Sequence, residues 1–279
     1  MTPTSASPPV RVMGVINVTP DSFSDGGRFD DLTSAILQAR RLIAEGVDIL
    51  DIGGESTRPG AAPVGEDQEL DRVIPLIRAI RAESAIPISV DTMTPAVARA
   101  AVEAGATMWN DVSALRHAPD SLAVAADLGC EVVLMHMQGE PGTMQTEPHY
   151  DDVVGEVAAF LTARAEAAQA AGVARERIWL DPGVGFGKHM TRHNLPLLAG
   201  LDRIVALGFP VLLGVSRKSF ISAIDGGNVP ADQRLGGSIA GALVGAAAGV
   251  AAVRVHDVRE TVQALKVWRA IAAARAPAV

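Results

Sequence analysis

The feature that most constrains the fold is a repeated pattern in which an Ala-rich, helix-favouring segment ends at a glycine and a short apolar run follows. A glycine after the last turn is typical of a helix C-terminus, because glycine readily adopts the left-handed conformation that caps it. The glycines in this position are Gly46, Gly105, Gly129, Gly172, Gly208 and Gly249. The pattern therefore predicts that helices and strands alternate along the chain.

The apolar runs define the candidate strands. They are Val10–Ile16, Ile49–Ile52, Ile86–Val90, Thr107–Trp109, Glu131–Met135, Ile178–Leu180, Val211–Leu213 and Ala252–Val255. Between them, apolar residues at three- and four-residue spacings predict helices. These include Leu32–Ala44, Asp67–Ala82, Pro95–Ala104, Asp152–Ala171 and Val258–Ala273.

Short strands that are apolar throughout are typical of a parallel sheet covered by helices on both faces. Eight such repeats in 279 residues indicate an α/β protein and favour a closed (β/α)8 TIM barrel over an open doubly wound sheet. No linker divides the chain, so residues 10–279 are predicted to form one catalytic domain. Residues 1–9 are rich in Pro, Ser and Thr without an apolar core, which predicts a disordered lead-in rather than a signal peptide.

Composition narrows the class of function. The chain is 48% apolar and 20% charged, which allows a soluble protein a large core. A net charge of −8 argues against nucleic-acid binding, which requires a basic face. The single cysteine, Cys130, excludes a disulfide framework and a cysteine-based zinc site, and its place before an apolar run predicts a buried structural thiol.

The segment Leu235–Val253 carries no charge and has glycines at every fourth residue from Gly237 to Gly249. Its length suits a membrane span, and its spacing resembles a helix seam of small residues. Because Ala and Gly contribute little transfer free energy, we predict a buried helix that runs into a strand instead. The small residues let this helix approach either the barrel wall or a second subunit.

Polar residues gather where the predicted strands end. They are Asn17, Asp51, Asp91, Asn110 with Asp111, His136, Asp181, Ser216 to Lys218, and Arg254 with His256. Active sites of (β/α)8 barrels lie at this end of the strands. A cap or turn explains any one such residue, but a polar group at every strand end indicates an active site.

The charges of these residues also differ along the chain. Arg217, Lys218, Arg254 and His256 follow the last two strands, where barrels commonly bind phosphate, so we predict an anion site there. The opposing half offers Asp91, Asn110 and Asp181, whose acceptors and amide suit the N–H-rich edge of a flat heterocycle such as an aminopyrimidinone. Phe186 is predicted to stack on or wall that ring.

The stretch from Asp181 to Lys188 has three glycines at alternate positions around one aromatic residue, which lets a ligand approach the backbone. It is not a phosphate loop, because that motif requires Gly and Ser or Thr where Pro182 and His189 stand. We predict a ligand loop of another kind, with Lys188 a surface residue at a helix start. Residues 18–27 and 56–60, rich in turn formers and hydroxyls, are predicted to be loops that close over substrate.

Five motifs carry a resemblance to a known family. They are Met13–Gly27, Asp51–Gly60, Asp181–Gly187, Ser216–Lys218 and Arg254–Asp257. In this order they resemble bacterial dihydropteroate synthases, the sulfonamide targets of folate synthesis. The resemblance runs from about Val10 to Ala270, outside which only the N-terminus and residues 271–279 remain.

The resemblance implies site residues at the matching positions. The pterin pocket is implied to contain Asp91, Asn110, Asp181 and Lys218, lined by Met135, Gly185, Phe186 and Gly214. Diphosphate contacts are implied for Arg254 and His256, with Val255 between them predicted to bind substrate. The Mg²⁺ position is implied for Asn17, and the p-aminobenzoate end for Phe23, Thr57, Arg58 and Ser219. The implied catalytic residues are Asp91, Asp181, Lys218, Arg254 and His256.

The implied reaction condenses (7,8-dihydropterin-6-yl)methyl diphosphate with p-aminobenzoate, giving dihydropteroate and diphosphate. Acidic residues near the pterin and cations near the leaving group favour a dissociative path, in which a pterin cation forms before the amine attacks. The resemblance also implies a Mg²⁺ cofactor, sulfonamides as competing ligands, a cytoplasmic location and a homodimer. We expect no nucleic-acid or membrane partner.

Three alternatives differ in what they require. A folate-binding domain of a corrinoid methyltransferase has no need of a p-aminobenzoate site, which Phe23 and the Thr57–Arg58 pair indicate. A non-catalytic pterin-binding paralogue has no need of a leaving-group site. A zinc hydrolase is favoured only by a scatter of histidines, of which His189 and His193 stand four residues apart without a supporting carboxylate.

Overall fold

The computed structural model describes residues 9–18, 28–55, 64–139 and 142–274. Parallel strands form one sheet in the order β6-β5-β4-β3-β2-β1-β8-β7. The strands are β1 (Arg11–Asn17), β2 (Ile49–Gly53), β3 (Ile88–Asp91), β4 (Met108–Asp111), β5 (Glu131–Met135), β6 (Ile178–Asp181), β7 (Leu212–Gly214) and β8 (Ala252–Val255). The last gap is bridged by the parallel pair Leu180–Val211, so the sheet closes on itself.

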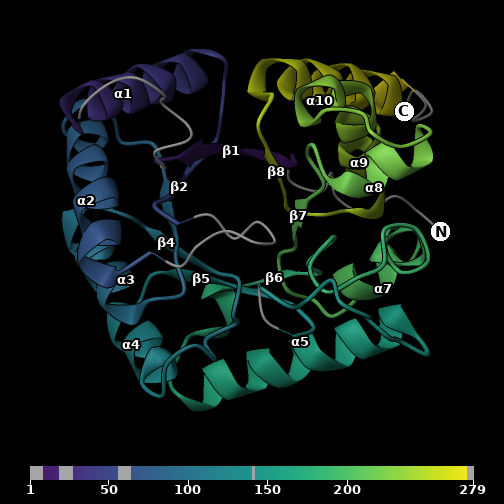
Figure 1. Cartoon of the computed structure of the whole chain (residues 1–279), viewed down its shortest axis with the longest axis horizontal. Helices are drawn as coiled ribbons and strands as arrows, with labels where there is room; N and C mark the ends of the chain where they lie inside the picture. Colours follow the sequence, from purple (N-terminus) through teal and green to yellow (C-terminus); the bar gives the residue numbers. More distant parts are fainter. Residues whose placement is uncertain (1–8, 19–27, 56–63, 140–141, 275–279) are drawn as a thin grey trace.

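Helices surround this barrel, as Figure 1 shows for a view along its axis. They are α1 (Arg28–Ala44), α2 (Glu66–Glu83), α3 (Pro95–Ala104), α4 (Ser121–Leu128), α5 (Val153–Ala170), α6 (Asn194–Ala199), α7 (Leu201–Val205), α8 (Ser219–Ile224), α9 (Leu235–Ala248) and α10 (Val258–Ala274). The architecture is a (β/α)8 barrel, as predicted, and the open doubly wound alternative is wrong. Each predicted strand lies within two residues of an observed one. Gly129 and Gly208 predicted helix ends close to those of α4 and α7, but no bounds were predicted for the short helices α4, α6, α7 and α8, because few turns leave little periodicity.

The predicted capping glycines adopt the predicted conformation. Gly105, Gly129 and Gly249 follow α3, α4 and α9 with φ angles of 115°, 58° and 89°. The other three glycines of the pattern also have positive φ. Glycine is needed at these positions because a side chain disfavours left-handed backbone.

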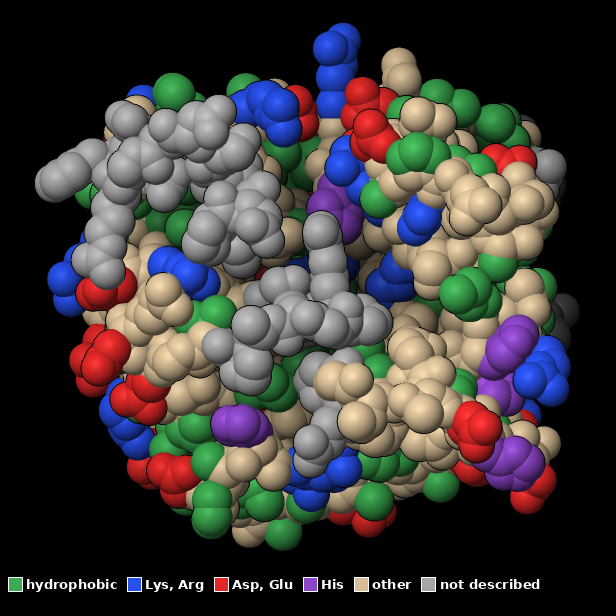
Figure 2. All heavy atoms as spheres, in the orientation of Figure 1, with side chains coloured by type: hydrophobic (Ala, Val, Ile, Leu, Met, Phe, Trp, Pro, Cys, Tyr) green, Lys and Arg blue, Asp and Glu red, His purple; other side chains and the backbone are tan. Residues whose placement is uncertain are grey.

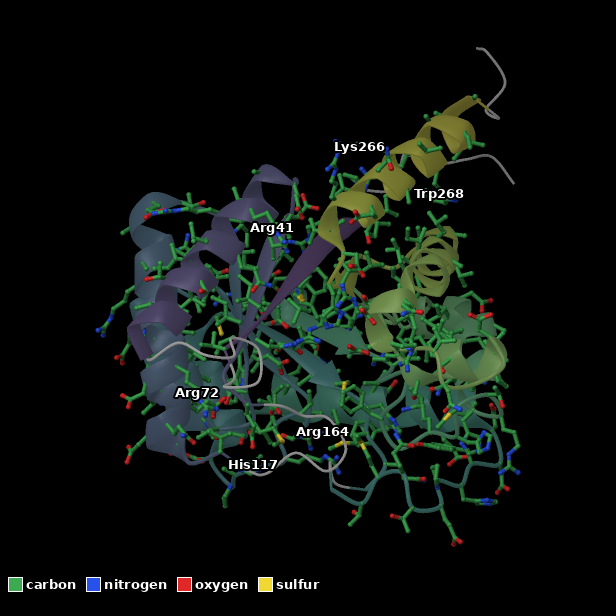
Figure 3. The ribbon with its side chains drawn as sticks, turned by 45° about the horizontal axis from the view of Figure 1, so that its top comes forward. Arg41, Arg72, His117, Arg164, Lys266 and Trp268 are labelled. Carbon is green, nitrogen blue, oxygen red and sulfur yellow. The ribbon has the colours of Figure 1, made fainter. Side chains whose placement is uncertain are left out.

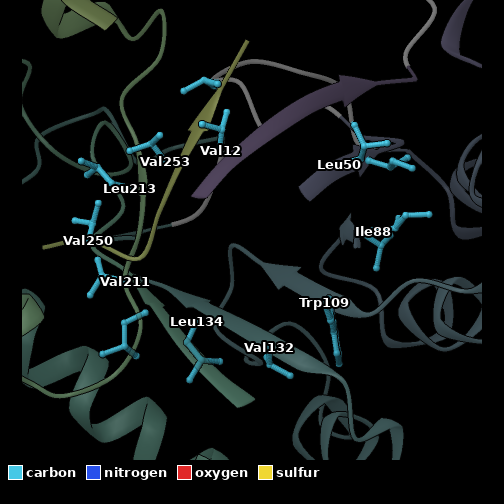
Figure 4. Close-up of a cluster of buried hydrophobic side chains, with 14 of the residues drawn as sticks. Val12, Leu50, Ile88, Trp109, Val132, Leu134, Val211, Leu213, Val250 and Val253 are labelled. Atoms are coloured by element: carbon cyan, nitrogen blue, oxygen red, sulfur yellow. The ribbon is translucent and has the colours of Figure 1, made fainter. Parts of the chain in front are cut away.

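The core has two parts, one on each face of the barrel wall. Inside the barrel, apolar side chains form a compact floor consisting of Met13, Ile49, Met108, Val133, Trp179, Leu212 and Ala252. Residues next to these in sequence point to the other face, towards the helices, because successive strand residues alternate. Figure 4 shows several of them, including Val12, Leu50 and Val253. The strands are therefore apolar on both faces, which explains their uninterrupted apolar runs.

The glycine seam of α9 faces the barrel wall. A Cβ placed on Gly241 would lie 3.0 Å from Cγ2 of Val215, and one on Gly245 would overlap Leu213. Gly241 and Gly245 therefore serve the packing of α9 on the barrel wall at Val215 and Leu213. Among the described residues, no helix is both long and apolar enough to cross a membrane. Cys130 is buried, as predicted.

Candidate active site

A polar layer lies directly above the apolar floor inside the barrel. Floor residues Met108, Val133 and Trp179 are each followed two positions later by a residue on the same face of the strand. The residues two positions beyond the floor are Val15, Asp51, Asn110, Met135, Asp181, Gly214 and Arg254, of which four are polar or charged. Asp91 joins this layer because it pairs in register with Asn110. The strand alternation therefore turns polar strand ends inwards, at the C-terminal mouth of the barrel.

A pocket opens at this mouth. It is lined by Asp91, Asn110, Val112, Met135, Asp181, Phe186, Gly214, Ser216, Lys218, Arg254 and His256. Nine of these residues belong to the predicted site, which the fold thus brings together from six strands and their loops. In the same view as Figure 1, basic side chains and a histidine lie near the middle of this face, whereas acidic side chains lie mostly at its rim (Figure 2).

Other predicted site residues lie elsewhere or outside the described residues. Gly185 is next to the pocket, because a Cβ on it would lie 3.2 Å from Cδ of Lys218. Ser219 is exposed at the start of α8. The Val255 side chain is 2% exposed and packs in the core on the helix side of β8, and a substrate contact of this residue stays a prediction. Phe23, Thr57 and Arg58 lie outside the described residues.

Arg254 is held between two carboxylates. Its Nε donates to Oδ2 of Asp51 at 2.6 Å, and its Nη2 donates to Oδ2 of Asp91 at 2.7 Å. Asp51 is fully buried, and Asn110 donates to the same Oδ2 at 3.4 Å. Two carboxylates thus fix the orientation of the Arg254 guanidinium. Its Nη1 group is not used in either of these two hydrogen bonds.

These contacts also set protonation. Burial raises the pKa of Asp91, the Arg254 charge opposes the rise, and the Asp51 charge adds to it. Burial acts to lower the pKa of Arg254, but the two carboxylates outweigh it and raise that pKa above its ordinary value. Arg254 is therefore a permanent cation between Asp51 and Asp91.

Lys218 and Asp181 face the same pocket from opposite sides. Lys218 Nζ donates to the carbonyl of Val184 and lies 4.5 Å from the ring centroid of Phe186. Burial lowers the pKa of Lys218 to about 8, although the Asp181 charge opposes this. Burial raises the pKa of Asp181, against the charge of Lys218 and a hydrogen bond from the Gly183 amide at 2.7 Å. The two residues form a polar wall around Phe186.

Two lining residues were missing from the predicted site. Ser216 hydrogen bonds to His256, with its Oγ 3.2 Å from the backbone N and 3.1 Å from Nδ1. It follows β7 in a polar triplet, which was a usable signal. Val112 follows Asp111 after β4, and nothing in its sequence context distinguishes it from other valines.

The Asp181–Lys188 stretch curls against the loop after β5. Gly183 and Gly187 have φ of 66° and 59°, and a Cβ on either would overlap the carbonyl oxygen of His136 or Gln138. Glycine is therefore required for the close approach as well as for the left-handed backbone. The prediction that Lys188 is a surface residue is wrong, because Lys188 is 1% exposed.

His136 does not enter the pocket, although it follows β5. It succeeds Met135, which points inwards, so its own ring points to the helix side and packs at 4.8 Å from the ring of Phe160. The described residues contain no group of three or more His, Cys, Asp or Glu side chains that could hold a metal ion. A zinc hydrolase is thus without a site in this part of the chain.

Asn17 has the chemistry of a Mg²⁺ ligand. It ends β1, and a Cβ on Gly53 would lie 3.7 Å from its Oδ1 and 3.5 Å from Cβ of Asp91. Its amide oxygen thus stands at the mouth beside the acidic layer. Mg²⁺ is typically bound by one or two protein oxygens together with substrate phosphates. A single Asn fits a metal that arrives with a diphosphate.

The pocket, the barrel and the sequence together define the class. The sequence matches the pterin binding enzyme family over residues 13–256, so the chain belongs to that family. Its curated relatives include the dihydropteroate synthase of Escherichia coli K12, which is 47% identical over 265 residues that cover 95% of this chain and 93% of that protein.

Solved structures agree. Xanthomonas albilineans dihydropteroate synthase with 4-aminobenzoic acid has a TM-score of 0.89 and 52% identity, covering 95% of this chain and 94% of that one. Yersinia pestis dihydropteroate synthase with a sulfonamide drug has a TM-score of 0.89 and 44% identity, covering 95% of both chains. The described fold and the family therefore agree over nearly the whole chain.

Proposed function

We propose that this chain is a dihydropteroate synthase, which condenses (7,8-dihydropterin-6-yl)methyl diphosphate with p-aminobenzoate in folate biosynthesis. One observation carries the proposal: a single pocket holds two carboxylates and an amide together with an arginine, a lysine and a histidine. The first set suits the N–H edge of a pterin, and the second suits a diphosphate. The relatives named above share this activity at 44 to 52% identity.

Pterin recognition falls to the acidic half of the pocket. Asp181 and Asp91 accept from the ring N–H groups, and the Asn110 amide both donates and accepts. Met135 and Phe186 cover the apolar faces of the ring, and Gly214 leaves space beside it. The apolar floor closes the barrel below this pocket.

Diphosphate binding falls to Arg254 and His256. The guanidinium is already fixed by Asp51 and Asp91, so it reaches phosphate oxygens without reorganisation. Mg²⁺ held by Asn17 would neutralise charge on the departing diphosphate. The fixed guanidinium and the His256 ring stabilise the same growing charge.

The reaction follows a dissociative path. The methylene C–O bond breaks first and its electron pair leaves with the diphosphate; the amine then forms the C–N bond and loses a proton. Asp91 and Asp181 stabilise the positive charge on the pterin in between. Isotope effects at the methylene carbon and its hydrogens measure this directly, and values typical of a tight associative transition state would rule the path out.

The p-aminobenzoate end is proposed for Phe23, Thr57, Arg58 and Ser219. Sulfonamides are proposed to compete there, as the Yersinia pestis complex suggests by its ligand. A folate-binding domain of a methyltransferase has no use for such an end. Competition between a sulfonamide and p-aminobenzoate, but not the pterin, distinguishes the two functions.

The homodimer is proposed on a different observation from the glycine seam. Val244 on α9 and Val267 and Ile271 on α10 are 48%, 55% and 52% exposed. The two helices contact each other, and exposed apolar side chains on both support a contact with a second copy. Light scattering after size exclusion measures the mass in solution. We expect the wild type to have the mass of a dimer and Val267→Glu to have that of a monomer. A wild type with the mass of a monomer would contradict the proposal.

The proposed activity is tested by incubating the chain with the pterin diphosphate, p-aminobenzoate and Mg²⁺ and following diphosphate release. Release that depends on the amine, together with dihydropteroate in the product, is the expected result. Release that is independent of the amine indicates hydrolysis, and no release contradicts the proposal. Omission of p-aminobenzoate is the internal control.

A further inference from the structure

The backbone carbonyls of the loop after β6 are held by side chains one after another. The oxygens of Gly183 and Phe186 accept from Lys188 at 2.9 and 3.0 Å, and that of Val184 accepts from Lys218. The oxygen of Gly185 accepts from Gln145 at 2.6 Å and that of Gly187 from Tyr150 at 2.8 Å. Five consecutive carbonyls thus depend on four side chains.

Lys188 supplies two of these bonds and is the only one of the four donors that is almost fully buried. Its Nζ also lies 2.9 Å from Nδ1 of His136. Four acceptors surround this Nζ: the two loop carbonyls, the carbonyl oxygen of His136 at 3.4 Å and the imidazole nitrogen. Among the described residues, no acidic side chain forms an ion pair with Lys188, so its contacts are with the backbone and with His136.

The protonation of His136 agrees with this geometry. Burial and the charge of Lys188 lower the pKa of His136 to about 3, so the ring is neutral at physiological pH. A neutral ring has a lone pair, and Nδ1 is therefore able to accept from the Lys188 amine. The loop is thereby tied to β5, on the side away from the pocket.

We infer that Lys188 is a positioning residue, which holds the Asp181–Phe186 segment in the conformation that binds the pterin. The inference deepens the proposed function and rests on it. Lys218 holds the same loop from the pocket side, but it is also a proposed pterin contact. When a ligand engages Lys218, the Val184 carbonyl loses its donor, and Lys188 is the buried donor that keeps the loop in place.

Two consequences follow for catalysis. Phe186 belongs to this loop, and Asp181 ends β6 directly before it and accepts from the Gly183 amide at 2.7 Å, so loss of the Lys188 amine displaces an acceptor and a ring wall together. The p-aminobenzoate end lies on other loops and does not depend on Lys188. The expected signature is therefore a selective loss of pterin affinity, and not a general loss of activity.

The chain contains three lysines, Lys188, Lys218 and Lys266, which supplies a matched control. Lys266 is exposed on α10, and Figure 3 shows it at the outer side of that helix. Replacement of lysine by methionine retains most of the side-chain volume and removes the donors. Lys188→Met is expected to raise KM for the pterin diphosphate about tenfold or more and to leave KM for p-aminobenzoate within about twofold, whereas Lys266→Met is unchanged.

A merely structural role would lower the melting temperature without this selectivity. Leu42→Ala, at a buried position of α1 that does not line the pocket, serves as a second control with reduced stability. Lys188→Met and Leu42→Ala are assayed well below their melting temperatures. Equal KM values for the pterin in Lys188→Met and wild type, with the wild type active, overturn the inference, whereas an inactive wild type overturns the proposed function instead.

A second measurement needs no variant of Lys188 in the assay. Lysine labelled with ¹⁵N gives side-chain signals for three residues, of which Lys218 and Lys266 are assigned from their Met variants and Lys188 as the signal that remains. Slow proton exchange of the Lys188 amine, both with and without the pterin diphosphate, together with a ligand-induced change at Lys218, is the expected result. Exchange at Lys188 as fast as at Lys266 contradicts the inference, even if Lys188→Met fails to fold.

Discussion

Arg217 and Asp257 form a two-point ion pair that joins the residue before Lys218 to the residue after His256. Nε lies 3.0 Å from Oδ2, and Nη2 lies 2.5 Å from Oδ1. Arg217 adopts a left-handed φ of 61°, which a non-glycine residue retains only where its surroundings fix it. The pair therefore couples the loops that carry two of the proposed catalytic residues.

Asp257→Asn weakens this coupling while retaining the size of the side chain. We expect kcat/KM for the pterin diphosphate to fall about tenfold, because Lys218 and His256 are no longer held in one geometry. Glu83→Gln is the control, since Glu83 pairs with Arg40 in the same two-point manner at 2.8 and 2.5 Å but on the surface. A fall of equal size in both variants would argue against a special role for the pair.

Asp51→Asn leaves Arg254 with one carboxylate inside the barrel. Removing a partner of a buried ion pair costs about 3 kcal/mol, and we expect urea unfolding to show a loss of that order. The affinity for diphosphate-containing substrate is expected to fall as well, because Arg254 loses its Nε anchor. Asp127→Asn, which removes an exposed partner of Arg99, is expected to change neither quantity, and an Asp51→Asn variant as stable as wild type would contradict the assigned role.

Glu69 on α2 predicts a pH dependence of stability. It is 1% exposed below Gly54, and burial raises its pKa to about 7, against a hydrogen bond from Thr92. Because the folded chain retains this proton longer than the unfolded chain, the associated stability is full below pH 4.5 and is lost as the pH rises to 7. The free energy of unfolding of Glu69→Gln is expected to gain roughly 2 to 3 kcal/mol over wild type between pH 5 and pH 8.

Urea unfolding of the two proteins at both pH values measures this difference. Glu103→Gln, at an exposed position on α3, is the control and is expected to follow wild type at both. A constant difference between Glu69→Gln and wild type from pH 5 to pH 8 would show that Glu69 does not titrate in this range.

Lys218 predicts a pH dependence of binding. Burial lowers its pKa to about 8, so the ammonium loses its proton as the pH rises through that value. We expect kcat/KM for the pterin diphosphate to decline above pH 8, because the neutral amine is a weaker donor to a carbonyl or phosphate. The decline should be absent from the much lower profile of Lys218→Met, and its persistence there would assign it to another group.

The spacing of apolar runs predicted the barrel, and the polar residues at the strand ends predicted most of the residues that line the pocket. Alternation places Asp91, Asn110 and Asp181 inwards, as the polar strand ends predicted, and the same alternation turns His136 outwards because Met135 already points in. Lys188 escaped prediction for another reason. Its burial depends on a contact with His136 across 52 positions, and local sequence shows only a lysine after a glycine.

The central claim, that the pocket at the barrel mouth binds the pterin, is tested most directly by calorimetric titration of wild type and Asp181→Asn with the pterin diphosphate. Among the described residues, Oδ1 of Asp181 accepts from the Gly183 amide, a bond that the Asn oxygen retains, so the substitution spares the loop and removes the charge. The predicted result is binding by wild type and a roughly 100-fold weaker Kd for Asp181→Asn, the size of one or two charged hydrogen bonds, with little change in melting temperature. Equal affinity of the two proteins, or a large loss of melting temperature with affinity intact, would contradict the account.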